Sequence, residues 1–82
     1  MKDVQKHLEK AIKINPEFAD AHFELGLLLV EKKKVKEARK HFEKTIQINT
    51  NDAKAHFHFA LLLQVISEFE LSREHFLKAI DI

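Results

Sequence analysis

The 82-residue sequence contains no cysteine. This absence excludes a disulfide framework, a zinc site with thiolate ligands and a cysteine nucleophile. The first five residues, Met1 to Gln5, contain no apolar signal-peptide core. No apolar run approaches the roughly 20 residues that cross a bilayer. These absences favour an intracellular protein without a membrane partner, and they identify no particular compartment.

Turn-forming residues are nearly absent, because glycine and proline occur only once each, at Gly26 and Pro16. A chain with so few turn formers and so much leucine, alanine, lysine and glutamate is expected to be almost entirely helical. An excess of charge of one sign is missing too. Lys and Arg number 14 and Asp and Glu number 13, which leaves a net charge of +1. This balance predicts no general attraction to nucleic acid or acidic membranes.

The chain does contain an internal repeat with a period of 34 residues. Residues 19–48 are identical to residues 53–82 at thirteen of thirty aligned positions. The same register continues upstream, where the segment from Lys2 to Asn15 matches the segment from Lys36 to Asn49. We therefore interpret the chain as one array of three parts: the second helix and linker of a partial upstream repeat (1–18), repeat 1 (19–52) and repeat 2 (53–82).

Each repeat predicts a pair of helices. The Asn15-Pro16 step is a helix-start signal, because asparagine can cap and proline is tolerated in a first turn. The first helix of each repeat is apolar nearly all round, which is typical of a helix held between neighbours. The second carries a single apolar stripe with helical spacing. Five helices and no strand are expected: about 18–31, 35–48, 52–65 and 69–81, with one more in residues 1–18.

This period and pattern resemble the tetratricopeptide repeat family. Leu25-Gly26 match that family's Leu-Gly pair, where a small residue lets two helices approach. Phe42 takes the aromatic position of the second helix. The chain departs from the family at His22 and His56, where tryptophan is usual. The other matching residues are Leu29, Ala38 and Thr45 in repeat 1 and Phe59, Ala60, Leu63, Ser72, Phe76 and Ala79 in repeat 2.

The resemblance implies an all-α fold, a solenoid of antiparallel helix hairpins with a right-handed superhelical stack. It also implies a protein–protein interaction scaffold rather than an enzyme, in which the first helices line a concave groove for peptides or other domains. Carried over residue by residue, the groove candidates are Asp20, Phe23, Leu27, Val30, Glu31, Lys54, Phe57, Leu61, Gln64 and Val65.

The predicted groove is mainly apolar. Family members that clamp the acidic tails of chaperones carry lysine, asparagine and arginine there, so binding of such tails is not expected here. An apolar groove with a charged rim suits an amphipathic helix or an apolar peptide. The alternative is that Phe23 and Phe57 pack against neighbouring repeats or cover each other, because a stacked helix exposes little of its surface.

Six histidines invite a metal interpretation. His7, His41 and His75 recur at the 34-residue period and are expected to form a row along the outer face of the second helices. Neighbouring members of such a row lie roughly 9–10 Å apart, too far for one ion whose ligands lie near 2 Å from it. His22 and His56 are expected to pack between helices. We therefore predict no metal and no cofactor.

The sequence shows no catalytic constellation. The only serines, Ser67 and Ser72, lie in no strand-to-helix elbow, and there is no glycine-rich phosphate loop. The basic stretch from Lys32 to Lys40 lacks interleaved aromatic residues on which bases could stack. It indicates a solvated turn, with binding of an acidic partner or nucleic acid as the alternative. The prediction is that there is no nucleic-acid partner.

Both ends of the array leave apolar residues uncovered. Val4 and Leu8 lack a partner helix, and Phe76 and Leu77 lack the polar capping helix that repeat stacks usually need. Either the chain is a segment of a longer array or it forms a homo-oligomer through these ends. The sequence thus predicts a scaffold that binds a protein or peptide partner. The alternative is a structural or self-assembly segment of a larger array without its own ligand.

Overall fold

The computed structural model describes residues 2–81, which form five α-helices and contain no strand. This confirms the all-α prediction and the number of helices. Met1 and Ile82, the outer ends of the first and last predicted parts, lie outside the described residues. The helices are α1 (Lys2–Ile14), α2 (Ala19–Glu31), α3 (Val35–Ile48), α4 (Ala53–Val65) and α5 (Phe69–Asp81).

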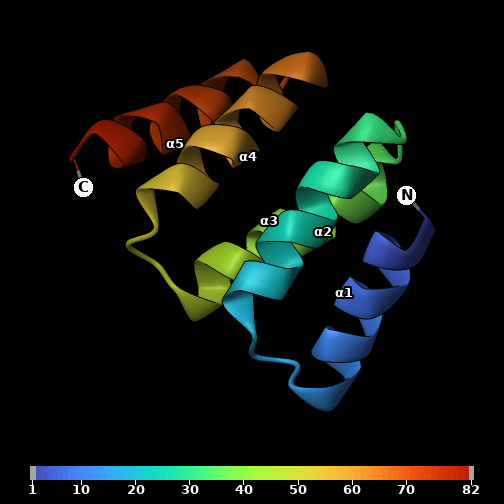
Figure 1. Ribbon diagram of the computed structural model, residues 1–82. Coiled ribbons are helices and arrows are strands. Elements are labelled where there is room, and N and C mark those ends of the chain that lie inside the picture. Colours follow the sequence, from blue (N-terminus) through green and yellow to red (C-terminus); the bar gives the residue numbers. More distant parts are fainter. Residues whose placement is uncertain (1, 82) are drawn as a thin grey trace.

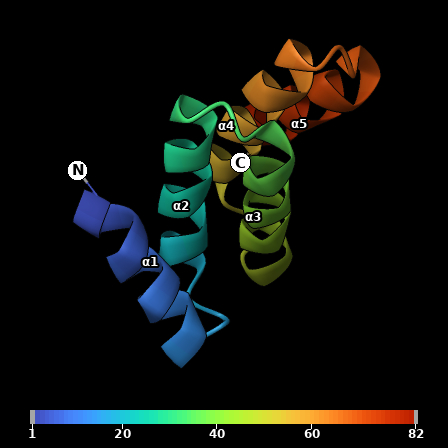
Figure 2. The same cartoon turned by 90° about the vertical axis from the view of Figure 1, so that its right-hand side faces the viewer.

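The helices are arranged as successive hairpins. Helices α2 and α3 form one antiparallel hairpin and α4 and α5 form the next (Figure 1). Helix α1 packs on α2, and α3 packs on α4, so every part of the chain touches the part that follows it (Figure 2). The body measures 34 × 24 × 16 Å, so it is elongated and thin, and most helices keep one face at the surface.

Helices α2 and α4 each begin one residue later than predicted, because the residue before them is an extended N-cap. Asp52 caps α4 through a carboxylate that accepts a hydrogen bond from the Ala55 amide at 3.1 Å. Phe18 precedes α2 without a side-chain cap. The predicted cap, Asn15, instead accepts a hydrogen bond from the Glu17 amide at 3.2 Å. It therefore stabilises the turn before the helix rather than the helix itself.

The core is one continuous apolar cluster that joins α2, α3 and α4. The ring of Phe42 lies at its centre, close to Phe23 and Phe59 from the two flanking helices. Gly26 faces this ring so closely that a β-carbon there would lie 2.8 Å from the Phe42 Cε1 atom. The small residue thus permits the close approach of α2 and α3 that the family pattern implies.

Both hairpin turns contain a residue in the left-handed conformation. Lys33 has a φ of 62° and Ser67 a φ of 67°. The Lys34 amide donates to the Leu29 carbonyl and the Lys33 amide to the Val30 carbonyl, which closes α2 with the hydrogen bonds of a Schellman motif. Glycine is usual at such positions because a β-carbon strains the left-handed backbone.

Replacing Gly26 with alanine should destabilise the protein by about 1–2 kcal/mol, because crowding against Phe42 outweighs the better helix propensity of alanine. Urea unfolding followed by circular dichroism measures the change. The control is the same substitution in a Phe42→Leu background, where the smaller side chain leaves room. If Gly26→Ala costs as much there as in the wild type, the contact with the ring is not the cause.

Replacing Lys33 with glycine should raise the free energy of unfolding by about 0.5–1 kcal/mol, because the strain of the left-handed turn is relieved at some cost in unfolded-state entropy. Lys33→Ala is the matched control, since it removes the charge but keeps the β-carbon. Equal stabilisation of both variants in urea unfolding would attribute the gain to charge rather than to backbone conformation.

Candidate functional site

An apolar groove of about 470 Å³ lies between α2, α3 and α4, which we call the central groove. Four predicted groove residues line it: Leu27, Val30, Leu61 and Val65. Because Leu27 and Leu61 occupy equivalent positions in the two repeats, the repeat brings their side chains to one surface. The remaining lining residues are Lys33, Val35, Phe42, His58 and Leu62.

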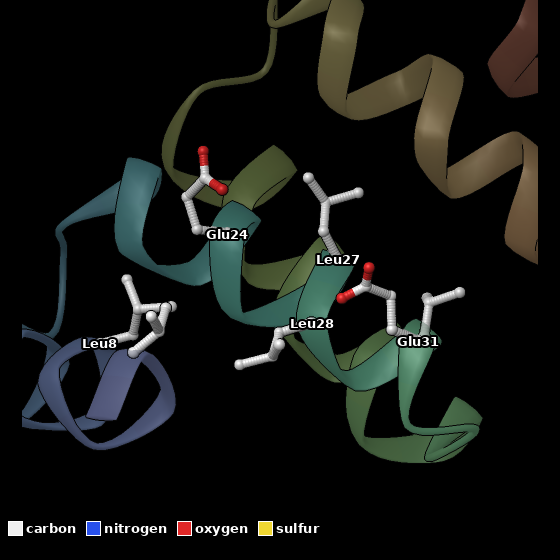
Figure 3. Close-up of a pocket in the computed structure, with 7 residues that line it drawn as sticks. Leu8, Glu24, Leu27, Leu28 and Glu31 are labelled. Carbon is white, nitrogen blue, oxygen red and sulfur yellow. The ribbon is translucent and has the colours of Figure 1, made fainter. Parts of the chain in front are cut away.

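A second hollow, of about 720 Å³, lies between α1 and α2 (Figure 3). It shares Leu27 and Val30 with the central groove, so the two hollows flank one apolar ridge on α2. Another predicted residue, Glu31, lines this second hollow. The lining is completed by Val4, Leu8, Glu24 and Leu28.

The sequence prediction missed Val4 and Leu8 as lining residues, since it treated them only as an uncovered edge. Two features of the sequence could have indicated that Val4 and Leu8 face α2. They have helical spacing, and they are in register with the second helices, which pack beside a first helix. It also missed His58 in the central groove. No repeat signal points to that residue, because the equivalent position of repeat 1 holds Glu24.

Phe23 corrects the groove prediction, because it is only 5% exposed and belongs to the core. Its ring packs against Phe42 at 5.9 Å and His58 at 5.3 Å between ring centroids. The ammonium group of Lys54 lies 5.2 Å above the Phe23 centroid, a cation–π contact. For this residue the core-packing alternative is therefore the right one.

The other predicted groove residues lie at the surface but line neither hollow. Phe57 is 45% exposed and packs edge-on against Phe76 of α5, with centroids 5.8 Å apart. Asp20, Lys54 and Gln64 are exposed.

The lining of the central groove carries one positive charge at pH 7, that of Lys33. Burial, together with the positive charge of Lys54, lowers the pKa of His58 below its ordinary value of 6.5. The imidazole is therefore uncharged near neutral pH, which leaves Lys33 as the charged residue of the lining. An apolar ligand flanked by an acidic residue would complement this surface.

His41 and His75 do not lie on the outer face of the second helices, where the sequence placed them. His41 and His75 turn toward the first helix of their own hairpin. The Nδ1 atoms of His22 and His41 lie 3.0 Å apart, and those of His56 and His75 lie 2.8 Å apart. The prediction failed because it considered only distances along the stack. The recurring separation of 19 residues between partners was the signal for contact across a hairpin.

Within residues 2–81, no set of three or more histidine, aspartate and glutamate side chains is gathered as metal ligands. No helix in this part of the chain combines the length and apolarity needed to cross a membrane. In the basic stretch, Arg39 pairs with Glu43 at 3.1 Å and with Glu68. That stretch therefore includes an ion-pair network between α3 and the turn before α5.

The chain is similar to a protein-family model and to solved structures of known proteins. The tetratricopeptide repeat family model matches residues 2–64. A crystal structure of MamA superposes with a TM-score of 0.89 at 27% identity and covers 94% of this chain and 45% of that one. A structure of MamA from Desulfovibrio magneticus RS-1, from residue 41 to its end, gives a TM-score of 0.86 at 22% identity and covers 90% and 42%.

The chain thus spans less than half the length of these two solved structures. No curated protein matches the sequence.

The equivalent residues Phe23 and Phe57 should respond differently to truncation. Phe23→Ala should cost about 3–5 kcal/mol because it leaves a cavity in the core. Phe57→Ala should cost about 1 kcal/mol, because its ring is already half exposed. Urea unfolding of both variants checks this, and each serves as the other's control. Similar losses would contradict the placement of Phe23 in the core and Phe57 at the surface.

Proposed function

The chain belongs to the tetratricopeptide repeat family, and from that membership we propose that its central groove binds the apolar face of an amphipathic helix in a partner protein. Domains of this family generally mediate protein–protein interaction and are typically non-enzymatic scaffolds. The observation that carries the proposal is a row of exposed apolar side chains, Val30, Leu61 and Val65, above a core that is already complete without them.

The size of the groove is consistent with a moderate affinity. Burying a valine or leucine side chain contributes about 1.5–3 kcal/mol, so three or four such anchors supply roughly 5–12 kcal/mol before the costs of association. Because association costs about 4 kcal/mol or more, the net free energy of binding is at most about 8 kcal/mol, which corresponds to a Kd of about 1 μM or weaker. The groove therefore suits a reversible partner.

A helix is a better occupant than an extended strand. The described residues contain no sheet edge to which a strand could add. The walls of the groove are helix surfaces, whose ridges accept the side chains of another helix at spacings of three and four residues. Lys33 at the rim favours an acidic residue beside the apolar stripe of the partner.

The alternative function is a structural or self-assembly segment of a larger array. Helix α5 favours it, because Phe69, Leu77 and Ile80 are exposed there outside the central groove. A following hairpin or a second copy of the chain would bury this surface as α4 buries α3. In either case we propose that residues 1–18, 19–52 and 53–82 act as one array rather than as separate domains.

Val65→Asp should weaken binding through the groove, because a carboxylate would enter its apolar lining. The measurement uses a 16-residue peptide selected on the wild-type protein from a random display library. Fluorescence anisotropy should then show at least a tenfold higher Kd for Val65→Asp, equivalent to about 1.4 kcal/mol or more.

Ile80→Asp is the matched control, since Ile80 is 77% exposed and Val65 is 74% exposed. It should leave peptide affinity within about twofold and should weaken any self-association seen by sedimentation. Equal loss of peptide binding in both variants, or a selected peptide without apolar residues at helical spacing, would contradict the groove proposal. Loss of self-association alone would favour the alternative.

A further inference from the structure

Each hairpin contains one buried histidine that bonds in two directions. His22 is 6% exposed and His56 is 1% exposed. The Nε2 atom of His22 lies 2.9 Å from the Pro16 carbonyl oxygen, and that of His56 lies 2.8 Å from the Thr50 carbonyl oxygen. Their Nδ1 atoms meet the histidine of the second helix. Each imidazole therefore joins the connector before the hairpin to both helices of the hairpin.

These contacts determine where the protons lie. A carbonyl oxygen only accepts, so the Nε2 atoms of His22 and His56 must donate. A neutral imidazole that donates from Nε2 has a bare Nδ1, which accepts. His41 and His75 must therefore donate from Nδ1. The ring planes of His56 and His75 are inclined to each other by 22°, and their centroids lie 5.0 Å apart.

A pair of this kind tolerates one additional proton but not two. The first can enter at the Nε2 atom of His41 or His75 and leaves the N–H···N bond intact. With two, both Nδ1 atoms carry hydrogen and both rings are positive, so donors and like charges face each other at about 3 Å. In the unfolded chain both histidines of a pair are free to charge. Acid therefore adds more protons to the unfolded chain than to the folded one.

We propose that the two histidine pairs, His22–His41 and His56–His75, form a proton-sensitive device that holds each hairpin closed near neutral pH and releases it in mild acid. The Nδ1–Nδ1 contacts and the carbonyl bonds occur in both hairpins with the same atoms. The arrangement therefore recurs with the repeat. The device stands independently of what the groove binds.

Charged groups on the neighbouring helices act on the second histidine of each pair, His41 and His75. Burial and, to a smaller extent, the facing His22 lower the pKa of His41. Glu37 of α3 and Glu9 of α1 raise it. Burial, His56 and Lys78 lower the pKa of His75. Glu74 of α5 and Glu43 of α3 raise it. The positive charge of Lys78 acts on His75 and has no counterpart among the groups that act on His41.

The direction of the pH effect follows from these lowered values. Below the ordinary histidine pKa of 6.5, His41 and His75 bind protons less readily in the folded chain than in the unfolded chain. Folding therefore weakens as the pH falls through this range, by up to tenfold in the folding constant per pH unit for each such proton. Helix α3 carries both His41 and the groove residue Phe42, so release of the α2–α3 hairpin also removes the groove floor. That consequence for binding rests on the proposed function.

The test compares urea unfolding at pH 7.5 and pH 5.5 for the wild type and for His41→Gln/His75→Gln. A glutamine amide donates to a neutral imidazole and, after rotating, accepts from a protonated one, so it removes the conflict. The folding constant of the wild type should fall at least tenfold between these pH values, and that of the variant no more than about threefold. A flat wild-type profile or an equal fall in both proteins would overturn the proposal.

The matched control is His7→Gln, because His7 occupies the equivalent place in α1 and is exposed. It should retain the wild-type pH profile, and a flattened profile would overturn the assignment to the pairs.

Imidazole ¹⁵N chemical shifts of the wild type keep the proposal testable if the glutamine variant fails to fold. They should show protonated Nε2 for His22 and His56 and protonated Nδ1 for His41 and His75. The opposite tautomers, or folded protein with all four rings doubly protonated, would overturn it. Peptide affinity is not part of these readouts, so a failed groove proposal would leave their outcome unchanged.

Discussion

The ring of Phe42 is the contact on which the rest of the structure depends. It is almost fully buried, it faces Gly26 of α2, and it packs beside Phe23 and Phe59. Through these contacts one side chain joins three helices, and it also lines the central groove. The groove can stay apolar and open because its floor is part of a rigid core rather than a mobile loop.

Equivalent residues of the two repeats have different environments because each repeat has a different neighbour. Phe23 is covered by His58 and Lys54 of α4, the helix that follows its own hairpin. Phe57 has Phe76 of its own hairpin beside it and keeps nearly half of its surface exposed. In a stacked array the burial of a residue therefore depends on the next unit as much as on its own.

The histidine pairs replace an apolar contact with a polar one at the place where the family usually has tryptophan. A tryptophan would bury more apolar surface. The imidazoles instead satisfy two carbonyl oxygens and one another, and no buried side-chain nitrogen or oxygen of the described residues lacks a partner. The hairpins thereby gain a contact whose strength changes with pH in the physiological range.

The sequence alone determined the helices, their order and the family, because the 34-residue period and the apolar spacing are properties of the chain itself. It also indicated Leu27, Val30, Leu61 and Val65 as residues of one surface. Only the tertiary structure decided that Phe23 is core, that Val4, Leu8 and His58 line the hollows, and that the histidines pair across each hairpin. These outcomes depend on the angle and distance between packed helices, and a one-dimensional pattern does not contain either quantity.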